Sequence, residues 1–165
     1  LNIDNPKLDC RLKGFEEFSP KRIIIDKNLV TKINSYIIRS VKKNNTIIIH
    51  NSSNNTKIQI LKKKGITLVK SKVDNKKLLD LKIILKKLYV LGTRNLLVEG
   101  GDKITKNLIK NRLIDKFYLF KSTKNLPKRR NNQTFTSFGI LNSKYKKKYK
   151  ISSKLIKDNI TIYKK

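Results

Sequence analysis

The stretch from Asn95 to Ile104 contains residues whose types and order could do chemistry. The apolar run Leu96–Val98 is typical of a buried strand, and it is followed by one carboxylate, Glu99, and then by two glycines. A helix is expected to begin at Asp102. Glycines in such a turn let a ligand approach the backbone, and the first N–H groups of a helix favour a phosphate. The segment predicts an anion-binding turn, and a glycine turn that only saves space is the alternative.

Two basic residues near the start of the chain could bind a second anionic group. Asp4-Asn5-Pro6 is a natural turn, because proline fixes its own φ and pushes Asn5 towards an extended form. Arg11 follows this turn, and a guanidinium can clamp a phosphate through two parallel hydrogen bonds. Lys27 follows a β-branched run that ends in Asp26. Either cation could instead be one of the many exposed basic residues of this lysine-rich chain.

In order and spacing, these segments resemble the reductase domain of the bacterial riboflavin-biosynthesis deaminase–reductase family. The family pattern is Asp-x-Pro-x-Leu-x-x-Arg, a strand ending in Asp, then Val-Glu-Gly-Gly, then a strand that starts with a Val-Asp-Glu-like sequence. The corresponding segments here are Asp4–Arg11, Arg22–Asp26, Val98–Gly101 and Leu113–Phe120. The resemblance therefore extends from Asp4 to about Phe120.

The resemblance implies a fold and a reaction. The fold is α/β and dihydrofolate-reductase-like, with a mostly parallel sheet, flanking helices and a C-terminal antiparallel strand pair. Residues 1–165 would form a single reductase domain that lacks the family's N-terminal strand. The implied reaction is NADPH-dependent reduction of 5-amino-6-(5-phosphoribosylamino)uracil to the ribitylamino product, by a homodimer. The nicotinamide carries the hydride chemistry, so no catalytic side chain and no metal is expected.

The resemblance also implies which residues contact the ligands. Leu8, Arg11 and Glu99 would contact the substrate, and the carboxylate of Glu99 would accept hydrogen bonds from a heterocycle. The expected cofactor contacts are two early residues, the second glycine and the first turns of the helix: Asp4, Lys27, Gly101, Asp102, Lys103, Ile104, Thr105, Lys106 and Asn107. Lys27 could meet the extra 2′-phosphate of NADPH. Asp102 must point away from the cofactor, because its carboxylate would repel a phosphate. For Glu99, a role in capping the turn or a place in solvent is the alternative.

Hydrophobic spacing predicts strands that alternate with helices. The expected strands of the parallel sheet are Arg22–Asp26, Thr46–His50, Ile66–Val69, Leu96–Val98 and Phe117–Phe120. The expected helices are a short one within Asn28–Lys43, Lys57–Lys64 ending at Gly65, one from Asp74 to Gly92, and Asp102–Arg112. Ser122–Phe138 is predicted to be a loop, and Tyr149–Leu155 and Asn159–Tyr163 to form an antiparallel pair.

The net charge of +30 has two interpretations. One is a basic nucleic-acid-binding α/β domain without catalysis. The other is a genome rich in A and T, whose codons favour Lys, Asn and Ile. The basic residues are spread along the chain without an interleaved aromatic series, so we favour the second interpretation. Only non-specific, salt-dependent attraction to nucleic acid is then expected. A reductase homologue that binds nucleotide without turnover is a further alternative.

The remaining chemistry-bearing residues are few. One cysteine, Cys10, allows no internal disulfide and no multi-cysteine zinc site. The zinc deaminase signature is absent, so any deaminase domain is expected upstream or in a separate protein. His50, the single histidine, is expected to have a surface or capping role. No apolar run is long enough for a membrane span and no signal peptide is apparent, so a cytoplasmic location is predicted.

Overall fold

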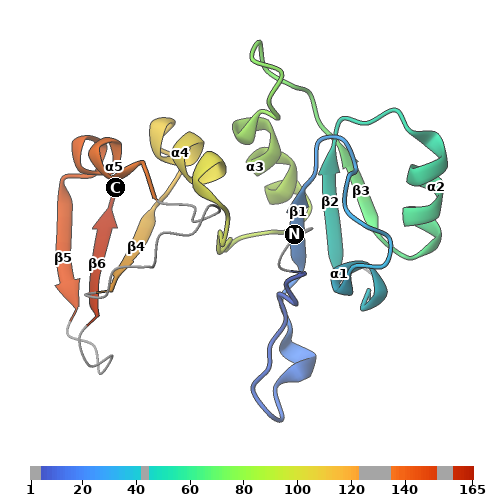
Figure 1. Ribbon diagram of the computed structural model, residues 1–165, viewed down its shortest axis with the longest axis horizontal. Helices are drawn as coiled ribbons and strands as arrows, with labels where there is room; N and C mark the ends of the chain where they lie inside the picture. The colour runs from blue at the N-terminus through green and yellow to red at the C-terminus, as the bar shows by residue number, and fades with distance from the viewer. Residues whose placement is uncertain (1–4, 42–44, 123–134, 152–157) are drawn as a thin grey trace, which may run out of the picture. The chain divides into compact units, whose positions relative to one another are not determined.

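The computed structural model describes residues 5–41, 45–122, 135–151 and 158–165 of the chain (Figure 1). The chain divides into two compact units, residues 1–92 and residues 93–165. Each unit has its own sheet and its own helices. Asp4, the first expected cofactor contact, lies outside the described residues, as do positions 123–134 of the predicted loop and 152–155 of a predicted strand.

The first unit contains the parallel sheet that the sequence predicts. Strands β1 (Arg22–Ile25), β2 (Thr46–His50) and β3 (Thr67–Lys70) are parallel and pair in the order β1-β2-β3. All five residues of the middle strand β2 are buried. The run of isoleucines in β2 therefore packs on both faces of the sheet, which is typical of parallel strands covered by helices.

The described part of this unit contains helices α1 (Tyr36–Arg39), α2 (Asn55–Lys63) and α3 (Leu81–Val90). A short 3-10 turn, η1 (Glu16–Phe18), precedes β1. The main core cluster joins the sheet to α1 and α2 through aliphatic side chains: Ile24, Leu29, Ile37, Ile38, Ile48, Leu61 and Ile66. Within the described ranges, no helix is long and apolar enough to cross a membrane.

The ends of two helices show how well local sequence defines a boundary. Helix α2 begins after Asn54, whose side-chain oxygen accepts a hydrogen bond from the N–H of Lys57 at 2.9 Å. It ends before Gly65, which has a φ of +85°, as the sequence predicts. The prediction that α3 begins near Asp74 is wrong. Asp74 instead closes a turn by accepting from the N–H of Leu78, and Asp80 caps the helix through the N–H groups at its start.

The described part of the second unit contains two helices and an antiparallel sheet. Helix α4 (Asp102–Lys110) precedes strand β4 (Lys116–Lys121), and helix α5 (Phe138–Lys144) precedes strands β5 (Lys147–Ile151) and β6 (Asn159–Lys164). The strand order is β4-β6-β5, which confirms the predicted terminal antiparallel pair. Strand β4 belongs to this antiparallel sheet rather than to the parallel series. The sequence does not predict α5, whose buried Leu141 packs with the core of the unit.

The predicted strand Leu96–Val98 is not a strand in the structure. These residues have no regular secondary structure, and Leu97 is 80% exposed. A strand needs hydrogen bonds from a neighbouring backbone, and neither sheet of the described residues includes this segment. An apolar run alone therefore did not determine its conformation. The α/β fold class, with a parallel sheet and an antiparallel strand pair, is confirmed.

His50 lies at the end of β2, where the expected surface position is wrong but the contact with the backbone of Ser52 fits the expected capping role. Its side chain is only 4% exposed, and its Nδ1 has no hydrogen-bond partner among the described residues. Burial lowers the pKa of His50 below its ordinary value of 6.5, and the contact with the backbone of Ser52 opposes this shift only in part. The folded protein therefore favours the neutral imidazole.

This pKa shift predicts that mild acid destabilises the fold. As pH falls from 7 to 5, His50 takes up a proton in the unfolded chain before it does so in the folded chain. The free energy of unfolding should therefore decrease across this window. Urea unfolding should show a clearly smaller decrease for His50→Asn, and no other histidine in the chain can obscure the comparison. An equal pH dependence in both proteins would contradict the assignment.

Candidate functional site

The turn before α4 requires a glycine. A Cβ added at Gly100 would lie 2.1 Å from Cγ2 of Ile104, a distance that no real side chain tolerates. The side chain of Ile104, in the first turn of the helix, therefore packs directly over the backbone of Gly100. The hydroxyl of Thr105 also donates to the carbonyl oxygen of Gly100 at 3.5 Å. The turn is consequently held close to the first turn of the helix by contacts that exclude a larger residue.

The N-terminus of α4 is not capped by a side chain. Its N-cap residue is Gly101, whereas Asn54 and Asp80 cap α2 and α3 through their side-chain oxygens. The first N–H groups of α4 consequently have no side-chain capping bond, and the helix dipole places partial positive charge there. This combination favours an anion such as a phosphate group.

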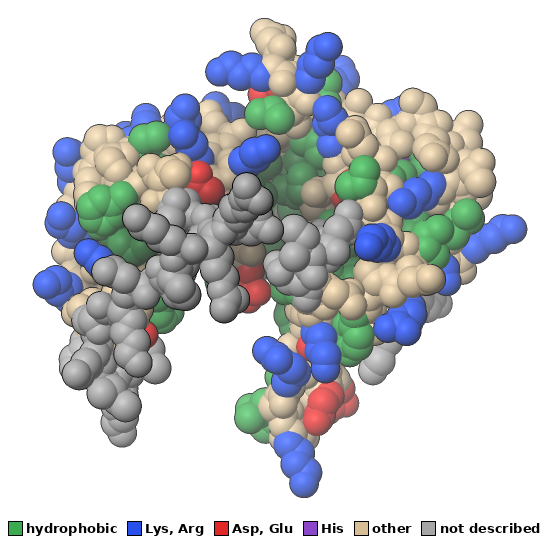
Figure 2. All heavy atoms as spheres, in the orientation of Figure 1, with side chains coloured by type: hydrophobic (Ala, Val, Ile, Leu, Met, Phe, Trp, Pro, Cys, Tyr) green, Lys and Arg blue, Asp and Glu red, His purple; other side chains and the backbone are tan. Residues whose placement is uncertain are grey.

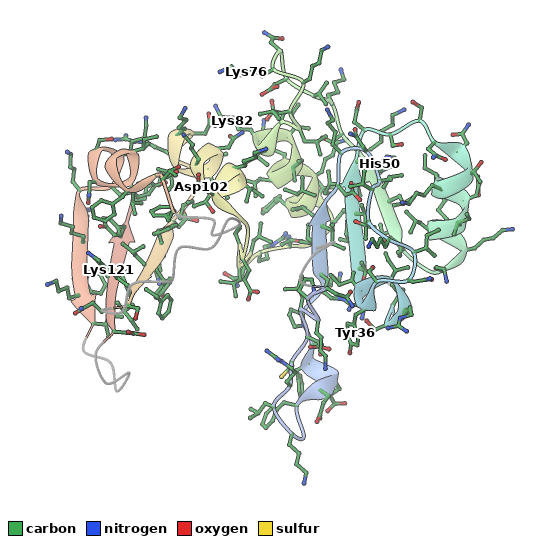
Figure 3. All side chains as sticks on the ribbon, in the orientation of Figure 1. Tyr36, His50, Lys76, Lys82, Asp102 and Lys121 are labelled. Atoms are coloured by element: carbon green, nitrogen blue, oxygen red, sulfur yellow. The ribbon has the colours of Figure 1, made fainter. Side chains whose placement is uncertain are left out.

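Asp102 lies at the first position of α4, and its carboxylate is bound elsewhere (Figure 3). It accepts hydrogen bonds from the N–H of Thr136 at 3.1 Å, from the hydroxyl of Thr136 at 2.6 Å and from the hydroxyl of Ser137 at 3.3 Å. The hydroxyl of Thr136 is the main cause of the lowered pKa of Asp102. The carboxylate is therefore ionised at neutral pH and is directed towards residues 136 and 137.

A hollow of about 400 Å³ lies beside this turn. It is lined by the residues around the start of α4, by four consecutive residues of β4 and by one further aromatic ring: Val98, Gly100, Gly101, Asp102, Thr105, Phe117, Tyr118, Leu119, Phe120 and Phe135. Successive strand residues point to opposite faces of a sheet, so a hollow that touches four of them runs along the edge of the strand. Among the described residues, β4 is an edge strand of its sheet. The hollow therefore combines aromatic rings with an exposed strand edge and an uncapped helix end.

The structure brings three of the predicted cofactor residues to this hollow: Gly101, Asp102 and Thr105. The side chain of Asn107 instead accepts a hydrogen bond from Asn111 at 2.7 Å, one helical turn along α4. The side chain of Ile104 packs over Gly100 in the glycine turn. Lys106 interacts electrostatically with Asp102. Lys103 is exposed and does not line the hollow.

The residues of β4 and Phe135 were missed as wall residues by the sequence analysis. The ring of Phe135 stacks on Phe117 with a centroid distance of 5.7 Å. The strand itself was predicted, but its position beside the α4 turn depends on packing within the unit. Glu99 is exposed in the irregular segment before the turn, so its predicted place at the end of a strand is wrong.

Three further candidates belong to the first unit. The side chain of Leu8 is half-buried and packs against the core cluster, and its φ is +51°. Arg11 is exposed. The ammonium of Lys27 donates to the carbonyl oxygen of Lys77 at 3.0 Å, so this cation is held against the backbone of a neighbouring turn.

The other charged side chains do not gather into one patch on the visible surface. Figure 2 shows Lys and Arg side chains scattered over the visible surface of both units, with few acidic groups between them. Among the residues that the structure describes, no group of three or more His, Cys, Asp or Glu side chains could hold a metal ion.

Comparisons with known proteins relate this chain to one family. The model of the RibD C-terminal domain family matches residues 1–157. Riboflavin biosynthesis protein RibD of Actinobacillus pleuropneumoniae is 26% identical over 117 residues, which are 71% of this chain and 30% of that protein. The RibD protein of Aquifex aeolicus (strain VF5) is 32% identical over 117 residues, which are 71% of this chain and 31% of that protein.

Solved structures support the same fold. Acinetobacter baumannii RibD, form 2, has a TM-score of 0.71 and 16% identity, and the match covers 98% of this chain and 43% of that chain. A pyrimidine reductase-like protein from Corynebacterium diphtheriae has a TM-score of 0.58 and 15% identity, covering 88% of this chain and 61% of that chain. The predicted dihydrofolate-reductase-like fold is thus confirmed. The chain spans less than a third of the length of the curated relatives that it matches.

The contact between the glycine turn and Ile104 can be tested by mutation. Gly100→Ala should lower the free energy of unfolding by about 1–3 kcal/mol, because its Cβ overlaps the Ile104 side chain. Ile104→Ala removes the overlapping atom, so the double variant should be less destabilised than the sum of the single variants. Urea unfolding measures all three, and Gly139→Ala is the control because a Cβ there meets nothing within 4 Å. Additive effects would show that the contact is absent.

Proposed function

The chain belongs to the RibD C-terminal domain family, and from this premise we propose that it is the NADPH-dependent reductase domain of a riboflavin-biosynthesis enzyme. The proposed reaction reduces 5-amino-6-(5-phosphoribosylamino)uracil to its ribitylamino product. The observation that carries the cofactor part of the proposal is the uncapped N-terminus of α4 beside an aromatic hollow.

The residues around α4 fit a dinucleotide. A nicotinamide cofactor supplies the hydride when it is bound. The N–H groups of the first α4 residues would hold its diphosphate, and Gly100 and Gly101 would let the diphosphate approach the backbone. The carboxylate of Asp102 is held by Thr136 and Ser137, so it does not occupy these N–H groups as a cap. The rings that line the hollow offer apolar surface to a planar group.

We assign substrate contacts to Leu8, Arg11 and Glu99. The carboxylate of Glu99 would accept hydrogen bonds from N–H groups of the pyrimidine, and the exposed guanidinium of Arg11 can bind the ribose phosphate through two bonds. Leu8 packs on the core, so its role would be apolar contact and support of the loop that carries Arg11. None of these side chains needs to act as a nucleophile, because the cofactor carries out the reduction.

Lys27 and Asp4 are the remaining proposed cofactor residues. The Lys27 ammonium would contribute positive charge towards the 2′-phosphate, which distinguishes NADPH from NADH. Its present partner is a neutral carbonyl oxygen, so a phosphate would be a stronger partner. Asp4 keeps the cofactor role that the family pattern implies.

We also propose the wider setting of this domain. The relatives are about three times as long as the matched region, which fits a deaminase domain elsewhere in the full-length protein. A homodimer and a cytoplasmic location follow from the same premise. Residues 1–165 would then act as a single reductase domain.

The cofactor assignment predicts a preference for NADPH over NADH. Nicotinamide fluorescence should show tighter binding of NADPH by the full-length protein at moderate salt. Lys27→Gln should weaken binding of NADPH more than binding of NADH, and Lys82→Gln, on the exposed part of α3, is the charge-matched control. Equal, weak binding of both cofactors that disappears with added salt would instead indicate non-specific attraction to a +30 chain.

The substrate assignment predicts a selective defect in Glu99→Gln. The amide replaces one acceptor oxygen with a donor, and a mismatched hydrogen bond costs about 1–3 kcal/mol, or roughly a 5- to 150-fold loss of kcat/KM for the pyrimidine. NADPH affinity, measured in parallel, should remain within about two-fold of wild type. Glu17→Gln, an exposed carboxylate in η1, is the control. An unchanged turnover rate would remove Glu99 from the proposed site.

A further inference from the structure

The loop from Asn5 to Arg11 has an unusual backbone. Asn5 and Leu8 have φ angles of +39° and +51°, in the left-handed region that residues other than glycine rarely adopt, so the expected extended form of Asn5 before Pro6 is wrong. Such conformations persist only where surrounding contacts hold them, and they are common where a loop must present side chains to a ligand. Leu8 and Arg11 are the two proposed substrate contacts in this loop. The contacts that hold the loop therefore bear on how the substrate is bound.

Tyr36, the first residue of α1, contacts the loop at alternate positions. Its backbone N–H donates to Oδ1 of Asn5 at 2.8 Å, and its hydroxyl donates to Oδ2 of Asp9 at 2.9 Å. The ammonium of Lys7 lies 5.5 Å from the centre of the Tyr36 ring. The hydrogen bond to Asp9 is also the main cause of the raised pKa of Tyr36. Tyr36, which Figure 3 labels, thus contacts the loop at residues 5, 7 and 9, through its backbone N–H, its ring and its hydroxyl.

Arg22 of β1 holds the same loop from the core side. Its buried guanidinium donates to the carbonyl oxygen of Lys7 at 3.4 Å and to Oγ of Ser40 at 2.8 Å. Burial lowers the pKa of Arg22, and the nearby carboxylate of Asp9 opposes this shift in part. Among the described residues, Oδ1 of Asp9 has no hydrogen-bond partner. The Tyr36 hydroxyl donates to Oδ2 of this carboxylate, and loss of that hydrogen bond would leave the Asp9 charge poorly satisfied.

We propose that Tyr36 is a positioning residue for substrate binding: it holds the loop Asn5–Arg11, through Asp9 and Asn5, in the conformation that presents Leu8 and Arg11 to the phosphorylated pyrimidine. The inference rests on the proposed function for its consequence in turnover. The expected effect on the order of the loop rests only on the contacts of Tyr36. These two consequences can be measured separately.

Kinetics of the full-length enzyme test the first consequence. Tyr36→Phe removes the hydroxyl and keeps the ring and the backbone N–H. It should raise KM for the pyrimidine by about three- to ten-fold, while kcat and KM for NADPH stay within about two-fold of wild type. Tyr149→Phe, an exposed tyrosine of β5, is the matched control. A fall in kcat without a change in KM would overturn the positioning role.

A double-mutant cycle tests whether Tyr36 acts through Asp9. Asp9→Ala removes the acceptor of the hydroxyl, so adding Tyr36→Phe to it should change KM no further. Asp9→Asn keeps an acceptor oxygen and should retain part of the effect of the hydroxyl. Multiplicative losses in Tyr36→Phe and Asp9→Ala would mean that Tyr36 contacts the ligand itself, and would overturn the proposal.

Amide hydrogen exchange supplies a readout that does not depend on turnover. Exchange of residues 5–11 should be several-fold faster in Tyr36→Phe than in wild type, with β2 unchanged. Unchanged exchange in the loop would overturn the proposal even if KM rises. If the wild-type enzyme does not reduce the pyrimidine but loop exchange is still faster in Tyr36→Phe, the proposed function is refuted. The role of Tyr36 in holding the loop is then still supported.

Discussion

The three hydrogen bonds to the carboxylate of Asp102 are the interaction on which the proposed cofactor site depends. A carboxylate at the first position of a helix could cap its free N–H groups or repel an approaching phosphate. Thr136 and Ser137 bind it instead, which joins the start of α4 to the segment before α5. The same bonds place Phe135, two residues before Ser137, beside β4, where it helps to line the hollow. One ionised side chain thereby leaves a helix end open and fixes part of the wall beside it.

Local sequence was sufficient for features that depend on a few neighbouring residues. The parallel strands of the first unit, the glycine after α2 and the start of α4 at Asp102 agree with their predictions because propensity, capping and turn chemistry act over one or two turns. The resemblance identified the family, because its motifs are spaced along most of the chain.

Features that depend on distant partners were not predictable in this way. Leu96–Val98 has the composition of a buried strand, yet it lacks a described neighbour to pair with. Strand β4 pairs with β6, which begins 38 residues after β4 ends. The residues of β4 alone therefore do not determine that it is an antiparallel strand. For the same reason, the contribution of β4 to the wall of the hollow was not predictable from its sequence. The contacts of Tyr36 with Asn5 and Asp9 span 31 and 27 residues and were likewise not apparent.

We propose that the open end of α4 receives the diphosphate of a nicotinamide cofactor. Backbone amide spectra of the full-length protein, recorded during titration with NADPH at moderate salt, test it most directly. We expect large, saturable shifts of the amides from Gly101 to Ile104, together with smaller shifts in residues 117–120 of β4. Small shifts spread over the lysine-rich surface, with the α4 amides unchanged, would contradict it.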